Sequence, residues 1–77
     1  MILFEGKVNH KYEIYGVYVE EEITRRLEAL GLNEGTEVVI LTRKRNGALI
    51  ISVRGTKLAL GKHITSKIEI VEEKADE

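Results

Sequence analysis

A helix is predicted by residues 20–32, whose sequence is EEEITRRLEALGL. Ile23, Leu27 and Leu30 recur at spacings of four and three residues, so they share one face of a helix that spans residues 20–30. This is the one stretch of the chain with a helical period over several turns. The order of the other elements is therefore set around it.

Charged side chains support the same helix. Glu21 precedes Arg25 by four residues, and Glu22 precedes Arg26 by four. Pairs in this order stabilise a helix by about 0.2–0.5 kcal/mol each. The carboxylates also lie in the first turn, where they complement the helix dipole.

The end of the helix is predicted at a glycine. Gly31 stands where a residue in the left-handed conformation ends many helices. Leu32 then follows at the position that contacts Leu27 in a Schellman closure.

Most of the remaining chain has the two-residue period of β-strands. Strands are expected at residues 11–19, 37–43, 49–53, 57–60 and 68–70. Gly16 indicates a bulge or a sharp bend within the first of them. The pair Asn46-Gly47 predicts a two-residue hairpin, Gly55 predicts a second tight turn, and residues 61–66 predict a short connector or one helical turn.

Five short strands, with one helix between the first and the second, favour a mostly β fold: a small SH3-like β-barrel. Closure into a barrel removes exposed sheet edges. Residues 1–71 are expected to form a single domain, in which residues 2–4 pack as a lid or a short edge strand. The charged residues 72–77 have the composition of a disordered tail.

Composition excludes several classes of protein. Thirteen acidic and twelve basic residues give a formal net charge of −1, unlike the strongly basic surface of a general nucleic-acid-binding protein. No apolar run is longer than that of residues 38–41, so no insertion into a membrane is expected. Residues 1–5 lack the pattern of a signal peptide. With no cysteine there is no disulfide framework and no thiolate metal site, and we expect a cytoplasmic protein.

Two stretches resemble the family of ferrous iron transport protein A, FeoA. The first is RRLEALGL at residues 25–32, followed by GTEV at residues 35–38. The second is VRGTKLAL at residues 53–60, followed by KIEI at residues 67–70. Together they span most of residues 12–71 in the order and spacing of the family.

This resemblance implies an SH3-like FeoA domain that is an accessory or regulatory protein of bacterial ferrous iron uptake. The implied partner is the cytosolic, GTPase-bearing domain of a membrane ferrous iron transporter, contacted by protein–protein interaction. A similar domain occurs in metal-dependent repressors, so a metalloregulator-type interaction domain is an alternative. No cofactor is expected, and weak self-association is left open.

The predicted interface for this partner is the end of the helix and the turn after it. Its residues are Arg25, Arg26, Leu27, Leu30, Gly31 and Leu32. The competing interpretation is that the two arginines only pair with Glu21 and Glu22. Two other apolar surfaces, Ile50 and one side of residues 38–41, either dock a partner or lie beneath the helix.

A resident metal site is not expected. Ferrous iron favours imidazole and carboxylate ligands that converge on one point. His10 and His63 are far apart in sequence, and the carboxylates lie mainly in the helix start and the tail. Two solvent-facing histidines are the simpler expectation, with a weak surface site at His63 or at residues 20–22 left open.

Catalysis and RNA binding have little support. No grouping of serine, histidine and aspartate is apparent, so the chain is not expected to be an enzyme. Basic residues are expected to gather around the hairpin at residues 46–47, namely Arg43, Lys44, Arg45, Arg54 and Lys57. No aromatic residues interleave with them, so a free-standing RNA-binding module remains only an alternative.

Overall fold

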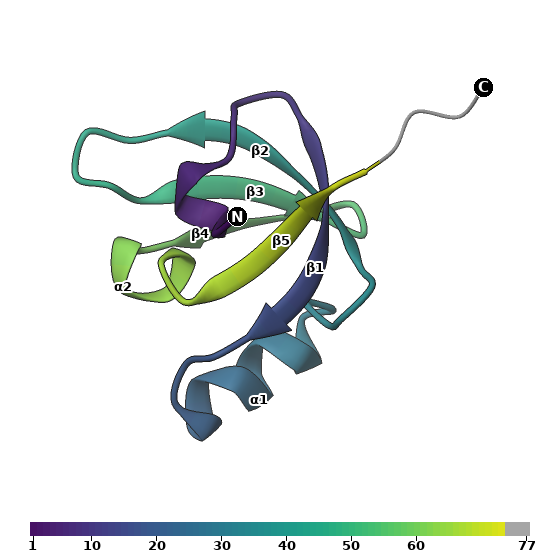
Figure 1. The fold of residues 1–77 in the computed structure, drawn as a ribbon. Coiled ribbons are helices and arrows are strands. Elements are labelled where there is room, and N and C mark those ends of the chain that lie inside the picture. Colours follow the sequence, from purple (N-terminus) through teal and green to yellow (C-terminus); the bar gives the residue numbers. More distant parts are fainter. Residues whose placement is uncertain (74–77) are drawn as a thin grey trace.

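A computed structural model describes residues 1–73 of the chain. The elements in order are a 3₁₀ helix η1 (Leu3–Glu5), β1 (Lys11–Val17), α1 (Glu21–Ala29), β2 (Glu37–Arg43), β3 (Leu49–Val53), β4 (Thr56–Leu60), α2 (Lys62–Thr65) and β5 (Ile68–Glu72) (Figure 1). The helix between the first two strands and the helical turn before the last strand are both as predicted.

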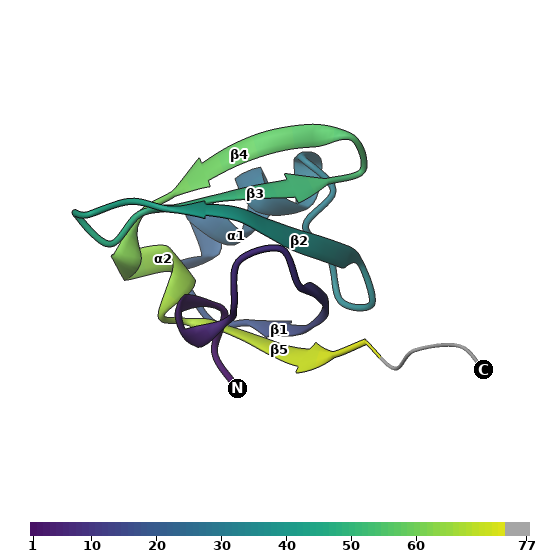
Figure 2. The same ribbon diagram turned by 90° about the horizontal axis from the view of Figure 1, so that it is seen from above.

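The five strands form one antiparallel sheet in the order β4-β3-β2-β1-β5. Figure 2 shows how this sheet curls, with β2, β3 and β4 in one layer and β1 with β5 in a second. The core fills the space between the layers. The mostly β barrel with one short helix between the first two strands is the architecture that the sequence predicts.

The core consists of branched aliphatic side chains and a single tyrosine. Leu49, Ile51 and Val53 of β3 are fully buried, which confirms the two-residue alternation of that strand. Among residues 1–73 the buried apolar residues are Leu3, Tyr12, Ile14, Leu27, Leu32, Val38, Ile40, Leu49, Ile51, Val53, Leu60, Ile68 and Ile70.

Strand β1 carries the bulge that the sequence predicts. The register with β5 shifts between Ile14 and Gly16. The exposed ring of Tyr18 lies over Gly16, in the space that a side chain at this position would take. Tyr12 is buried, whereas Tyr15 and Tyr18 are 64% and 65% exposed.

The predicted two-residue turn at Asn46-Gly47 is wrong. The amide of Lys44 donates to the carbonyl oxygen of Ala48 at 2.8 Å, which leaves three residues in the loop. Of these, Gly47 alone has a positive φ, at 92°, whereas a two-residue type I′ turn needs two such residues. That type of turn occurs instead at Arg54 and Gly55, whose φ angles are 52° and 80°.

The N-terminal segment of the domain is attached to β5, the last strand. Leu3 is fully buried, Ile2 forms a bridge with Glu69, and the amide of Ile70 donates to the carbonyl oxygen of Met1 at 2.7 Å. The N-terminal segment is therefore both a lid and a short edge partner. Glu72, the first residue of the predicted tail, is the last residue of β5 and pairs with Tyr12 of β1. Residues 74–77 of that tail lie outside the described residues.

Within the described part of the chain, no helix has the length and apolar character needed to cross a membrane.

Candidate interaction surface around α1

Helix α1 is anchored to the barrel by its apolar face. The side chain of Leu27 is only 4% exposed, and Ile23 packs against the same core. Leu30, predicted on this face, is instead 48% exposed, because it is the C-terminal cap, where the chain already turns away. Leu32 enters the core in its place and is fully buried.

The end of α1 has the predicted Schellman geometry. The amide of Leu32 donates to the carbonyl oxygen of Leu27 at 2.9 Å, and the amide of Gly31 donates to the carbonyl oxygen of Glu28 at 3.0 Å. Gly31 has a φ of 97°. These two bonds satisfy carbonyl groups that the last turn of a helix leaves free, so the position of the helix end is fixed.

The outer face of α1 is charged and exposed. Arg25 lies 2.9 Å from the carboxylate of Glu21, and Arg26 lies 3.9 Å from that of Glu22. The arginine side chains are 75% and 76% exposed. Exposed pairs of this kind contribute little to stability, at most about 1 kcal/mol, so these arginines are available to a partner.

The six residues of the predicted interface divide into two groups. Arg25, Arg26 and Leu30 face solvent. Leu27 and Leu32 are buried and hold the helix in place. Gly31 lies against Arg54 of the β3–β4 turn, since a Cβ atom on this glycine would be 2.8 Å from the Cδ atom of Arg54.

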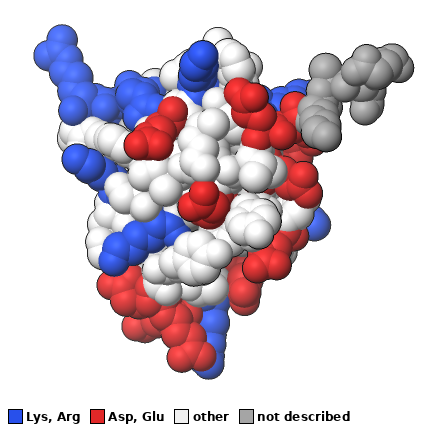
Figure 3. Space-filling model, viewed as in Figure 1, with Lys and Arg blue, Asp and Glu red and all other residues white. Residues whose placement is uncertain are grey.

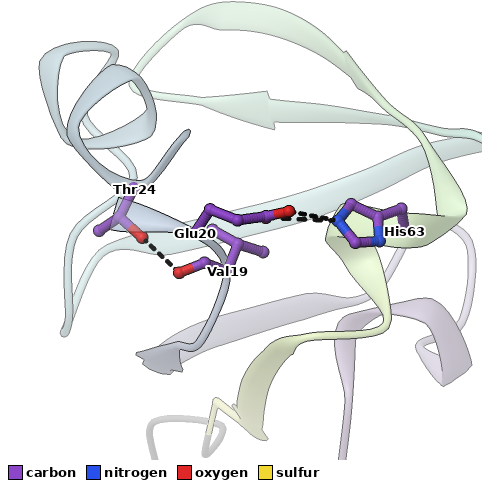
Figure 4. Close-up of polar contacts among 4 residues, drawn as sticks. All are labelled: Val19, Glu20, Thr24 and His63. Carbon is purple, nitrogen blue, oxygen red and sulfur yellow. Dashed lines mark hydrogen bonds and ion pairs between the residues drawn. The ribbon is translucent and has the colours of Figure 1, made fainter. Parts of the chain in front are cut away.

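An exposed polar contact links the start of α1 to α2, as Figure 4 shows. The Nε2 atom of His63 lies 3.2 Å from the Oε2 atom of Glu20, which connects α2 to the residue that precedes α1. The hydroxyl of Thr24 donates to the carbonyl oxygen of Val19 at 3.2 Å. The backbone amide of Glu20 and, to a smaller extent, the His63 imidazole lower the pKa of the Glu20 carboxyl.

Sequence analysis named His63 and residues 20–22 only as separate alternatives for a weak surface site, and it did not predict that Glu20 and His63 meet, because 43 positions separate them. Among residues 1–73, no three histidine or acidic side chains come together in a way that could hold a metal ion. His10 lies in the segment before β1, with its ring stacked near that of Tyr12 at a centroid distance of 6.4 Å.

The basic residues do not form the predicted cluster. Arg43, Lys44 and Arg45 lie at the start of the β2–β3 hairpin loop, whereas Arg54 and Lys57 lie at the β3–β4 turn. Because β3 runs from one of these hairpins to the other, the two groups are at opposite ends of the strand. The clustered surface on which the RNA-binding alternative depended is therefore missing.

Arg43 is also engaged within the domain. Its guanidinium group donates to the carbonyl oxygen of Gly6 at 2.6 Å and lies 5.2 Å from the centre of the Phe4 ring. The ammonium group of Lys62 lies over the same ring at 5.1 Å. These contacts attach η1 to the hairpin and to α2, which is a structural role.

The other apolar surfaces named from the sequence are partly covered. Val39, Leu41 and Ile50 are all half-buried.

A hollow lies between β1 and α1, and the sequence analysis did not anticipate it. It has a volume of about 330 Å³ and is lined by Val17 of β1, Thr24 and Glu28 of α1, and Leu32, Asn33 and Glu34 of the following turn. The turn is held against β1, because the amide of Gly35 donates to the carbonyl oxygen of Ile14 at 2.8 Å.

Comparison with known proteins identifies relatives of the whole domain. A sequence model described as the FeoA domain matches residues 1–72. A protein of Methanocaldococcus jannaschii named for Fe(2+) transport is 35% identical over 46 residues. That match covers 60% of this chain and 55% of the relative, so it spans about half of the relative's length.

Solved structures agree with this match. The solution structure of the FeoA protein from Chlorobium tepidum has a TM-score of 0.91 and 27% identity, covering 100% of this chain and 74% of that one. The FeoA protein of Stenotrophomonas maltophilia, solved in complex with zinc and described as an SH3 domain protein, has a TM-score of 0.78 and 25% identity, covering 92% and 89%. The predicted SH3-like fold is thereby confirmed.

Proposed function

Because this chain belongs to the FeoA domain family, we propose that it is an accessory protein of ferrous iron transport that binds the cytosolic domain of the iron transporter. The names of its relatives support the connection with ferrous iron. In this proposal the domain is a cytoplasmic binding protein and not an enzyme, and iron is the cargo of the transporter.

The observation that carries the proposal is the placement of α1. Figure 1 shows this helix outside the barrel, beyond the end of β1. Its apolar face is anchored by Leu27, and its end is fixed by the closure at Gly31. Arg25, Arg26 and Leu30 then form an exposed surface of two cations beside one apolar side chain.

A rigid surface of this kind suits regulation by binding. A partner influences a transporter only by as much as its affinity differs between the transporter's conformations. Because α1 is already ordered, docking costs little conformational entropy. Most of the binding free energy can therefore contribute to the difference in affinity between the transporter's conformations. The domain would then favour one conformation of the transporter's cytosolic domain.

The test is a binding measurement with matched charge reversals. The dissociation constant of the chain for the purified cytosolic domain of its own transporter is measured for the native chain, Arg26→Glu and Arg45→Glu. Arg45 is an exposed arginine at the tip of the β2–β3 hairpin, so its replacement makes the same change in net charge.

We expect Arg26→Glu to weaken binding by about tenfold and Arg45→Glu by less than about twofold. Equal losses in both variants would assign the effect to net charge and remove α1 from the interface. An absence of binding by the native chain would contradict the proposed function itself.

A further inference from the structure

The hollow beside α1 has two kinds of wall. Val17 contributes apolar surface, with the buried Leu32 behind it, and Glu28 and Glu34 contribute carboxylates. Val17 is half-buried, whereas both glutamates are exposed. The volume of about 330 Å³ is at the lower end of the ~300–1,000 Å³ range of ligand pockets, which suits a single side chain better than a nucleotide.

The two carboxylates have no ion-pair partner among residues 1–73. For Glu28 the basic residue within reach along the helix is Arg25, three positions earlier, and Arg25 pairs with Glu21 instead. Arg54 lies against the adjacent Gly31 but forms no ion pair with either glutamate. By contrast, Glu21 and Glu22 on the outer face are both neutralised by arginines.

The charges around this end of the molecule agree with the local arrangement. In Figure 3 acidic side chains gather at the lower end of the visible face, where α1 lies in Figure 1. Basic side chains project mainly at the upper left, where the β2–β3 hairpin lies. An anionic ligand would be repelled at the hollow, and a cationic one attracted.

We infer that the hollow receives a lysine or arginine side chain of the transporter's cytosolic domain. The aliphatic stem of such a side chain packs along Val17, and its charged end lies between the carboxylates of Glu28 and Glu34, a division that long basic side chains commonly adopt. The inference rests on the proposed function and adds to it. The surface around α1 then has arginine–glutamate pairs on its outer face and, at the hollow, two carboxylates without an ion pair among residues 1–73, so it sets the orientation of the partner as well as its identity.

The test compares the native chain with Glu28→Gln/Glu34→Gln, and uses Glu5→Gln as the control. Glu5 is also an exposed glutamate without an ion pair among the described residues, and it lies in η1, outside the hollow. Affinity for the transporter's cytosolic domain is measured at several salt concentrations from about 0.05 to 0.3 M, a range over which exposed charges become screened.

We expect the double variant to bind about tenfold more weakly at low salt and to depend less on salt than the native chain, while Glu5→Gln changes affinity less than about twofold. Binding by the double variant equal to that of Glu5→Gln would overturn the assignment of the hollow and leave the proposed function standing. No binding by the native chain would overturn both. Self-association of the native chain that disappears in the double variant would overturn the inference by assigning the hollow to a second copy.

Discussion

The amide of Leu32 donates to the carbonyl oxygen of Leu27 at 2.9 Å, and both side chains are buried in the same core. The backbone bond and the side-chain packing together fix the end of α1 against the barrel. Everything proposed for this surface depends on that rigidity, because the exposed arginines and the hollow lie on either side of the same helix.

Gly31→Ala is expected to destabilise the domain by about 1–2 kcal/mol. At a φ of 97° alanine is strained, and its Cβ atom would lie 2.8 Å from the Cδ atom of Arg54. Gly61→Ala is the control, because Gly61 has a φ of −73° and no atom within 4 Å of the added carbon. Urea unfolding of both variants checks this, and equal stabilities would contradict the described closure.

Glu73→Gln is expected to stabilise the domain at neutral pH and to have no such effect in acid. Partial removal from water, followed by the neighbouring Glu37, raises the pKa of the Glu73 carboxyl. The folded state therefore favours the protonated form, and stability falls as the pH rises from the unfolded pKa through the raised folded one. Glutamine at position 73 does not ionise, so the variant does not lose stability in this way as the pH rises.

Urea midpoints of Glu73→Gln and the native chain at pH 3 and pH 7 measure the effect. An advantage of the variant at pH 3 equal to that at pH 7 would mean that the carboxylate charge is not its cause.

His63→Gln is expected to raise the pKa of Glu20 only part of the way towards its ordinary value of 4.5. The larger cause of the lowered pKa is the backbone amide of Glu20 itself, which the substitution leaves in place. Because the folded pKa is depressed, the stabilisation by Glu20 is present above its unfolded pKa and is lost as the pH falls through the folded one. An NMR titration of the side-chain carboxyl carbon of Glu20 measures this, and a full return to 4.5 would assign the whole shift to His63.

Local sequence patterns predicted the features that depend on neighbouring residues. The spacing of Ile23 and Leu27, the glycine at position 31 and the alternation in β3 are all determined within a few residues, and the structure agrees with each. Leu30 was placed on the buried face because the helical period continues through it, but the helix ends one residue earlier.

Features that depend on the closure of the barrel were not predicted. The contact of Glu20 with His63 joins two connectors that are 43 residues apart. The hollow combines residues of β1, α1 and the turn after it, whose relative positions are set by the pairing of Ile14 with residues 35 and 36. The basic residues were expected together because both hairpins carry them, yet the direction of β3 separates the two groups.

The most direct test of the central claim is an NMR titration of the isotope-labelled chain with the cytosolic domain of its own transporter, first without metal and then with ferrous iron. The account predicts chemical-shift changes concentrated in residues 25–34, and much smaller changes at the β2–β3 hairpin. Shifts centred on the hairpin or on β4, or no shifts at saturating concentrations of the domain, would contradict it.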